Sequence, residues 1–205
     1  DLHSGNRATF LTDLSGVNVG DYLYVYRSWK SNNGAFRITD VGSNYVLVEG
    51  NPFLDETQNV KASIGTPIIF ANYQNEVVTV DVARSDCGHP VIYIESTEYI
   101  ILDGFRVTGS CHAGVSMLNG SHHNVFRNGE VFGNDRPGVY IASESSSKGN
   151  TYNIIDNNDI HSNGLNGPGE GIYIGEYGGD DDCDYNHILN NYIYDPLGGN
   201  EGTDI

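Results

Sequence analysis

The densest group of chemically active side chains is an acidic stretch near the C-terminal end, Glu176-Tyr-Gly-Gly-Asp-Asp-Asp-Cys-Asp184. Oxygen-rich clusters of this kind bind Ca²⁺ when backbone carbonyls and water complete the coordination shell. The spacing is not that of an EF-hand and matches no fixed motif. Two interpretations stay open, a calcium site and a merely solvated acidic loop. The ligands of the calcium site would be Glu176, Asp180, Asp181, Asp182 and Asp184.

The whole chain is strongly acidic, and its charge is uneven. It has 205 residues, with 10 Lys and Arg against 27 Asp and Glu, which gives a formal net charge of −17. No Lys or Arg follows Lys148. Such a chain repels phosphate backbones and anionic membrane surfaces, so we expect no nucleic-acid partner. No apolar run is long enough to span a membrane, so we expect no membrane insertion.

A second group with chemical potential consists of tyrosines in a repeated pattern. The pattern comprises V-I-Y-I (91–94), G-V-S-M (114–117), G-V-Y-I (138–141) and G-I-Y-I (171–174). The two-residue period of a strand directs Ile92, Val115, Val139 and Ile172 inward.

The residues between the inward positions form an outward column. Aromatic rings stack on sugar rings, so the tyrosines of this column are candidates for carbohydrate binding. The alternative is that Tyr simply suits a half-exposed strand surface. The candidates are Tyr93, Tyr140, Tyr173 and, in the acidic stretch, Tyr177.

A second strand-like element follows each of these segments. The four elements are residues 101–107, 125–131, 154–160 and 187–193. Such short strands cannot form a core alone, but stacked coil on coil they bury a continuous apolar interior. We therefore predict an all-β fold, a parallel β-helix of about four coils over residues 85–205. One further column, Gly104, Asn128, Asn157 and Asn190, predicts a ladder of turn asparagines.

The G-V-Y-I and G-I-Y-I segments, each followed by an N-x-I-x-x-N-x-I-type strand, resemble the pectate-lyase-like right-handed parallel β-helix superfamily. The resemblance covers about residues 85–205 and implies the fold more than an activity, since this superfamily holds lyases, hydrolases, adhesins and phage tail-spike parts. In similar uronate lyases, Ca²⁺ neutralises the substrate carboxylate while Lys or Arg removes the C5 proton. Arg136 and Lys148 flank the G-V-Y-I strand and are the candidate bases, although Lys148 also reads as an exposed loop lysine.

The first 84 residues show a different pattern, with strands at 21–26, 35–39, 45–49, 67–70 and 77–82 separated by polar turns. They predict a small antiparallel β barrel or sandwich that caps the first coil, with the boundary between Asn72 and Arg84. At the other end the chain stops at Ile205, inside a strand of a new coil. We expect that end to be open or truncated, and available for self-association.

Cys87 and Cys111 are 24 residues apart, about one coil, so they are predicted to form a disulfide if the protein is secreted. The third cysteine, Cys183, is left without a partner in the chain. The histidines His112, His122, His123, His161 and His187 are scattered over several coils, so a zinc site has little support, and the His122-His123 pair is interpreted as a turn feature.

Two functional hypotheses follow. The first is a secreted or cell-surface, calcium-binding β-helix that acts on or binds acidic polysaccharide, by lyase-like β-elimination if it is catalytic. The second is a non-catalytic structural or adhesive β-helix from a surface layer, filament or phage fibre. The lack of a clear catalytic base and the small number of coils favour the second.

Overall fold

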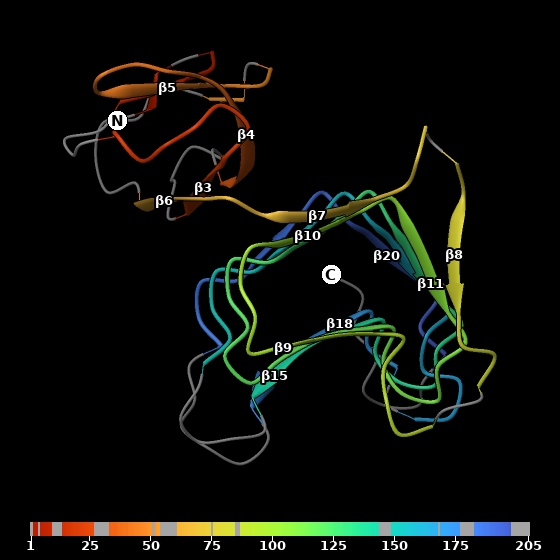
Figure 1. The fold of residues 1–205 in the computed structure, drawn as a ribbon. Coiled ribbons are helices and arrows are strands. Elements are labelled where there is room, and N and C mark those ends of the chain that lie inside the picture. The colour runs from red at the N-terminus through yellow and green to blue at the C-terminus, as the bar shows by residue number, and fades with distance from the viewer. Residues whose placement is uncertain are drawn as a thin grey trace. The chain divides into compact units, whose positions relative to one another are not determined.

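The computed structural model describes residues 2–3, 5–9, 14–26, 33–50, 52–53, 61–74, 76–84, 87–143, 149–167, 169–176 and 183–197. The chain divides into two compact units, Asp1–Ile68 and Ile69–Ile205, which we treat separately (Figure 1). All regular elements of the described residues are β-strands. No helix long and apolar enough to cross a membrane occurs among the described residues.

The N-terminal unit is one antiparallel sheet of six strands in the order β1-β2-β5-β4-β3-β6. Its core contains Leu23, Val25 and Ile38, all fully buried. The small antiparallel module is therefore confirmed, whereas a sandwich would need a second sheet, which the described residues of this unit do not form. The strands are β1 (Leu2–His3), β2 (Arg7–Thr9), β3 (Tyr22–Tyr26), β4 (Gly34–Val41), β5 (Tyr45–Val48) and β6 (Lys61–Gly65).

The second unit is a right-handed parallel β-helix with three parallel sheets. Figure 1 views it down the axis of the solenoid. Sheet 1 consists of β7 (Ile68–Ala71), β10 (Ile100–Asp103), β13 (Val125–Arg127), β16 (Ile154–Asp156) and β19 (His187–Leu189). Sheet 2 consists of β8 (Val78–Asp81), β11 (Phe105–Thr108), β14 (Glu130–Phe132), β17 (Asp159–His161) and β20 (Tyr192–Tyr194). Sheet 3 consists of β9 (Ile92–Glu95), β12 (Val115–Leu118), β15 (Val139–Ser143) and β18 (Ile172–Glu176).

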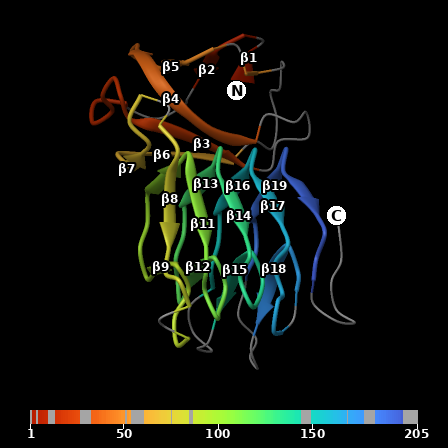
Figure 2. The same ribbon diagram turned by 90° about the vertical axis from the view of Figure 1, so that its right-hand side faces the viewer.

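The register of sheet 3 is the one predicted from the repeats. Val115 pairs with Ile92 on one side and with Val139 on the other, and Val139 pairs with Ile172. Figure 2 shows the strands of sheet 2 side by side in chain order, one for each coil. The apolar interior is continuous, because fully buried side chains such as Met117 come from successive coils.

The glycine that precedes strands β12, β15 and β18 is required by packing. A Cβ on Gly138 would lie 2.7 Å from Cγ2 of Ile160 and 2.8 Å from the carbonyl oxygen of Gly171. On Gly114 it would lie 2.5 Å from Cγ1 of Val131. The repeated glycine therefore leaves room for the inward side chains of sheet 2.

The predicted asparagine column lies on the surface in left-handed geometry. Asn128, Asn157 and Asn190 have φ values of 54°, 55° and 53°. Nδ2 of Asn157 donates to Oδ1 of Asn128 at 2.8 Å, but Nδ2 of Asn190 donates to Asp156 at 2.9 Å instead. The column is thus a ladder only in part.

Buried asparagines form further ladders that the sequence reading missed. Nδ2 of Asn158 donates to Oδ1 of Asn191 at 2.9 Å, and Nδ2 of Asn134 donates to Oδ1 of Asn163 at the same distance. These side chains lie at the corners between sheets, where backbone groups need other partners.

The predicted domain boundary between Asn72 and Arg84 needs correction. Strand β8 pairs in parallel with β11, and β7 is the neighbour of β10 in sheet 1, so residues 69–84 belong to the first coil. The described strands make four complete coils, followed by β19 and β20 of a fifth. The further strand expected at 202–205 lies outside the described residues.

Candidate functional site

The predicted tyrosine column exists, and its members differ in environment. Ser116 is the register partner of both Tyr93 and Tyr140, and Tyr140 pairs with Tyr173. The rings of Tyr140 and Tyr173 stack on each other with centroids 5.2 Å apart. One face of each ring is therefore covered by the other ring and is not available to a ligand. Tyr93 is separated from this pair by Ser116 and is 44% exposed.

Ser116 lies at an outward position but is fully buried. Its hydroxyl makes no hydrogen bond within the described part of the chain. The ring of His112 meets that of Tyr140 edge to face, with centroids 6.4 Å apart. The outward column is therefore covered at Ser116, on the coil between Tyr93 and Tyr140. That position offers no exposed surface on which a sugar ring could stack.

Most of the predicted calcium ligands cannot be placed. Asp180, Asp181 and Asp182 lie outside the described residues, as does Tyr177. Glu176 ends strand β18, but its side chain is not described. Asp184 is exposed. The calcium site remains a prediction.

Of the two candidate bases, Lys148 and Arg136, the structure describes one. Lys148 lies outside the described residues. Arg136 is exposed on the segment before β15. Of the four arginines described in the β-helix unit, it is the one that forms no ion pair with a described residue. Nothing in the described contacts brings Arg136 to the tyrosine column.

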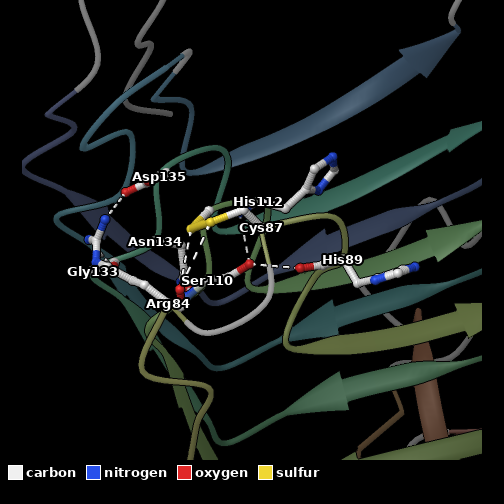
Figure 3. The surroundings of a disulfide bond; sticks show 9 residues. Arg84, Cys87, His89, Ser110, His112, Gly133, Asn134 and Asp135 are labelled. Atoms are coloured by element: carbon white, nitrogen blue, oxygen red, sulfur yellow. Dashed lines mark hydrogen bonds and ion pairs between the residues drawn. A yellow bond between two sulfur atoms is a disulfide. The ribbon is translucent and has the colours of Figure 1, made fainter.

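The predicted disulfide is present at the corner between sheets 2 and 3 (Figure 3). Cys87 and Cys111 are bridged, with their Cα atoms 4.5 Å apart. The guanidinium of Arg84, beside the bridge, forms an ion pair with Asp135 and donates to the carbonyl of Gly133 at 3.3 Å. The first and third coils are thus linked at this corner, and the remaining cysteine, Cys183, is free.

The richest set of polar and aromatic side chains lies on the outward face of sheet 2. The strand period places Val107, Val131 and Ile160 in the core, and all three are fully buried. The residues between them point outward in two rows that run from coil to coil. We call this surface the sheet 2 face; its residues are Arg106, Glu130, Phe132, Asp159, His161, Tyr192 and Tyr194.

The first row is charged, and Glu130 is at its centre. Arg106 forms an ion pair with Glu130 and also donates from Nη2 to Oε1 at 3.1 Å. Nε2 of His161 lies 3.2 Å from the same oxygen. Burial raises the pKa of Glu130, but the hydrogen bonds from Arg106 and His161 together outweigh it, so the net pKa is below the ordinary value. Glu130 is therefore held as a carboxylate.

Asp159 is the register partner of Glu130 on the next coil. The hydroxyl of Tyr194 donates to the Asp159 carboxylate, and burial, the charge of Asp159 and this bond raise the pKa of Tyr194. The other oxygen, Oδ1, is buried without a hydrogen-bond partner in the described residues. Two carboxylates therefore stand on neighbouring strands, whose backbones are about 4.8 Å apart along the solenoid.

The second row is aromatic. The rings of Phe132 and His161 stack with centroids 5.5 Å apart, and His161 stacks on Tyr194 at 4.9 Å. The guanidinium of Arg106 lies 5.0 Å from the centroid of Phe132. Tyr192, next to Tyr194, is 67% exposed and offers the most accessible ring of this face.

The sequence contained a signal for this face. It consists of the outward positions that flank Val107, Val131, Ile160 and Ile193 in the repeated elements. These positions hold Arg, Thr, Glu, Phe, Asp, His and Tyr, so no single residue type marks them as a column. The arrangement can do two things: accept and donate hydrogen bonds through fixed charged groups, and offer aromatic surface beside them.

Comparisons with known proteins add little to this geometry. No protein-family model matches the sequence. No curated protein matches it either. The structure is similar to the Gp54 tailspike of Acinetobacter baumannii bacteriophage AP22, solved in complex with A. baumannii capsular saccharide, with a TM-score of 0.30 and 11% sequence identity. The likeness covers 85% of this chain and 37% of the tailspike chain, so the fold assignment rests on the strand pairing described above.

Proposed function

We propose that this protein binds polysaccharide along the sheet 2 face. The observation that carries the proposal is a pair of adjacent rows on this face. Glu130 and Asp159 lie on neighbouring coils of one row, and Phe132, His161 and Tyr194 lie on successive coils of the other. A sugar chain is itself a linear repeat. A chain lying along the solenoid axis would therefore meet the same kind of contact on successive coils, about 4.8 Å apart.

The aromatic row supplies part of the contact. Because Phe132 and His161 are stacked within the row, their rings present edges to a ligand, whereas the exposed Tyr192 presents more of its ring. Aromatic side chains combine a large apolar surface with, for Tyr, a hydroxyl that can bind sugar oxygens. Tyr192 is thus the first residue to test.

The charged row supplies orientation. Sugar hydroxyls can donate to the carboxylates of Glu130 and Asp159 and accept from the guanidinium of Arg106. These side chains stand on strands and are fixed by one another, and sites on regular elements are held more precisely than sites on loops.

The finer form of the proposal is an acidic polysaccharide bound with Ca²⁺. Of the four arginines described in the β-helix, Arg84, Arg106 and Arg127 are already paired with carboxylates. A chain with a net charge of −17 would repel an acidic glycan unless cations lay between them. The predicted Ca²⁺ ligands, Glu176, Asp180, Asp181, Asp182 and Asp184, belong to the end of β18 and the segment between β18 and β19, so a glycan bound through Ca²⁺ would extend from the sheet 2 face to that segment.

Catalysis is a further step in the same proposal. A lyase would need a base at the proton that it removes. Lys148 and Arg136 are the candidates, and Arg136 keeps that role because its guanidinium forms no ion pair with any described residue. The disulfide between Cys87 and Cys111 supports an oxidising location, secreted or on a cell surface.

The test is binding to immobilised neutral and acidic polysaccharides, in Ca²⁺ and in EDTA. We expect Tyr192→Ala and His161→Ala to weaken binding, while the matched control Tyr73→Ala, at 68% exposure close to that of Tyr192, leaves it unchanged. Loss in Tyr93→Ala or Tyr140→Ala instead would move the site to sheet 3. Failure to retain any glycan, or equal loss in Tyr73→Ala, contradicts the proposal.

The lyase step has its own assay. Polygalacturonate and alginate with Ca²⁺ should give an absorbance increase from unsaturated product, which Arg136→Ala or Lys148→Ala should abolish. Binding without absorbance change would restrict the function to recognition.

A further inference from the structure

The corner between sheets 3 and 1 brings together two histidines and a glutamate from different coils. Glu98 forms an isolated parallel bridge with His122, so the two residues face each other across the first and second coils. Nδ1 of His122 lies 3.3 Å from Oε2 of Glu98 and 2.9 Å from Nδ1 of His123. The three side chains thus converge on one point.

This convergence depends on an unusual backbone conformation. Neighbouring residues of an extended strand point to opposite faces. His123 instead has a φ of 57°, in the left-handed region that few non-glycine residues adopt. The corner therefore directs consecutive imidazoles toward one another.

An aromatic stack holds the ring of His123 in place. Tyr99 lies on one side and Tyr152 on the other, each with its centroid 5.1 Å from that of His123. Tyr152 in turn stacks on Tyr185 at 5.0 Å. All four residues have positive φ values, so the stack is a repeated feature of this corner in which His replaces Tyr on one coil.

We propose that Glu98, His122 and His123 form a binding site for a divalent transition-metal cation, with Zn²⁺ as the representative ion. One nitrogen or oxygen from each residue lies within 4.8 Å of the others. In a tetrahedral zinc site with Zn–N bonds of about 2.0–2.1 Å, ligand atoms lie roughly 3.3 Å apart. The observed separations of 2.9 and 3.3 Å are close to that value.

The donor set selects the class of metal. Imidazole suits zinc, copper, nickel and cobalt, whereas calcium and magnesium prefer a shell made of oxygen. The side chains of Glu98 and His122 are 54% and 38% exposed, so a cation can enter and water can complete its shell. This site lies at the corner between sheets 3 and 1, apart from the sheet 2 face.

The hydrogen bonding of the His122 and His123 rings agrees with a role as metal ligands. The hydrogen bond between the two Nδ1 atoms places a proton on one nitrogen and a lone pair on the other. A bound cation takes the place of that proton, which leaves for the Nε2 atom or for solvent. Each neutral imidazole keeps one nitrogen lone pair, which is the donor that a metal ion requires.

The metal would join the first two coils, because Glu98 comes from one and the histidines from the next. Binding to the folded chain alone raises its stability. The third coil has Thr151 and Tyr152 in the corresponding positions, as the bond from the backbone N of His123 to the carbonyl of Thr151 indicates. The described coils therefore contain one such site.

The test is titration of the full chain with Zn²⁺ by calorimetry, in excess Ca²⁺ to fill oxygen-only sites. The variant His123→Tyr removes the nitrogen but keeps the ring stack and the backbone conformation that Tyr99, Tyr152 and Tyr185 already adopt. Glu98→Gln removes the carboxylate with little change of shape. His89→Ala is the matched control, since it removes an exposed histidine elsewhere.

We expect one Zn²⁺ per chain and a rise in melting temperature. Each of His123→Tyr and Glu98→Gln should lower the affinity by about tenfold or more, the size of effect that even outer-shell partners have, with His89→Ala unchanged. Co²⁺ should give the visible absorption bands of a low-symmetry site, and His123→Tyr should remove them. Binding that is absent, or equally strong in His123→Tyr with native circular dichroism, overturns the proposal.

Discussion

Oδ1 of Asn153 accepts two hydrogen bonds from Asn124, from its backbone N at 3.1 Å and from its Nδ2 at 3.2 Å, and both side chains are fully buried. The relation repeats one coil further on, where Asn153 donates twice to Oδ1 of Asn186 at 2.9 and 3.0 Å. Its Nδ2 also reaches the carbonyl of Ser121 at 2.9 Å. Buried asparagines therefore satisfy backbone groups at corners where the sheets are interrupted.

Replacement of Asn153 by Ala should be strongly destabilising. It leaves the backbone N of Asn124 and the carbonyl of Ser121 buried without these partners, and each such group costs about 1–3 kcal/mol. We expect the free energy of unfolding to fall by at least about 2 kcal/mol. Urea denaturation followed by circular dichroism measures the change.

The exposed column provides the control. Asn157→Gly removes the 2.8 Å hydrogen bond to Asn128 but keeps a residue that accepts the φ of 55°. Because water replaces this partner, the loss should stay within about 1 kcal/mol. Equal losses in the two variants would contradict the importance of burial.

The sequence sufficed to predict the coils because two periodicities agree, the two-residue alternation within each strand and the spacing from one coil to the next. Alternation fixed the inward set Ile92, Val115, Val139 and Ile172, and the coil-to-coil spacing fixed their register. The boundary was wrong because β7 has no buried residue. Ile68, Ile69 and Phe70 are 60%, 45% and 52% exposed, so no apolar alternation distinguishes this strand from one in the N-terminal sheet.

The candidate sites were harder to predict for two reasons. Asn153 and Asn157 are the same residue type, and only their position relative to a corner makes one buried and the other exposed. The meeting of His122 and His123 depends on a single left-handed φ that a bulky residue rarely adopts. These features depend on the path of the backbone, which the pattern of residue types does not determine.

Gly138 is a position where one methyl group should destabilise the solenoid. In Gly138→Ala the new Cβ would lie 2.7 Å from Cγ2 of Ile160 and 2.8 Å from the carbonyl oxygen of Gly171. Overpacking of this kind costs about 1–3 kcal/mol. A lowered melting temperature in thermal denaturation checks this.

Gly16→Ala serves as the comparison, because a Cβ there meets nothing within 4 Å. It lies in the N-terminal unit, and we expect its melting temperature to match that of the natural chain. A Gly138→Ala protein as stable as the natural chain would mean that Ile160 can move aside.

Thiol titration should separate the three cysteines. With the chain denatured but not reduced, one thiol should react, that of Cys183, and after reduction all three should. The Cys87→Ser, Cys111→Ser double variant should lose about 3 kcal/mol, since the bridge closes a loop of 24 residues. Three reactive thiols before reduction would contradict the disulfide.

The carboxylate of Glu130 should make stability depend on pH in the acid range. Its pKa in the folded protein is below the ordinary value of 4.5, so folding favours the ionised form. The stabilisation is fully present above the pKa of the unfolded chain and is lost as the pH falls through the lower folded pKa. Glu130→Gln removes it at every pH. The natural protein should therefore be the more stable one at pH 7, as measured by urea denaturation, and the two midpoints should converge as the pH falls through the folded pKa of Glu130. A difference that stays constant over this range would mean that Arg106 and His161 stabilise the neutral side chain equally well.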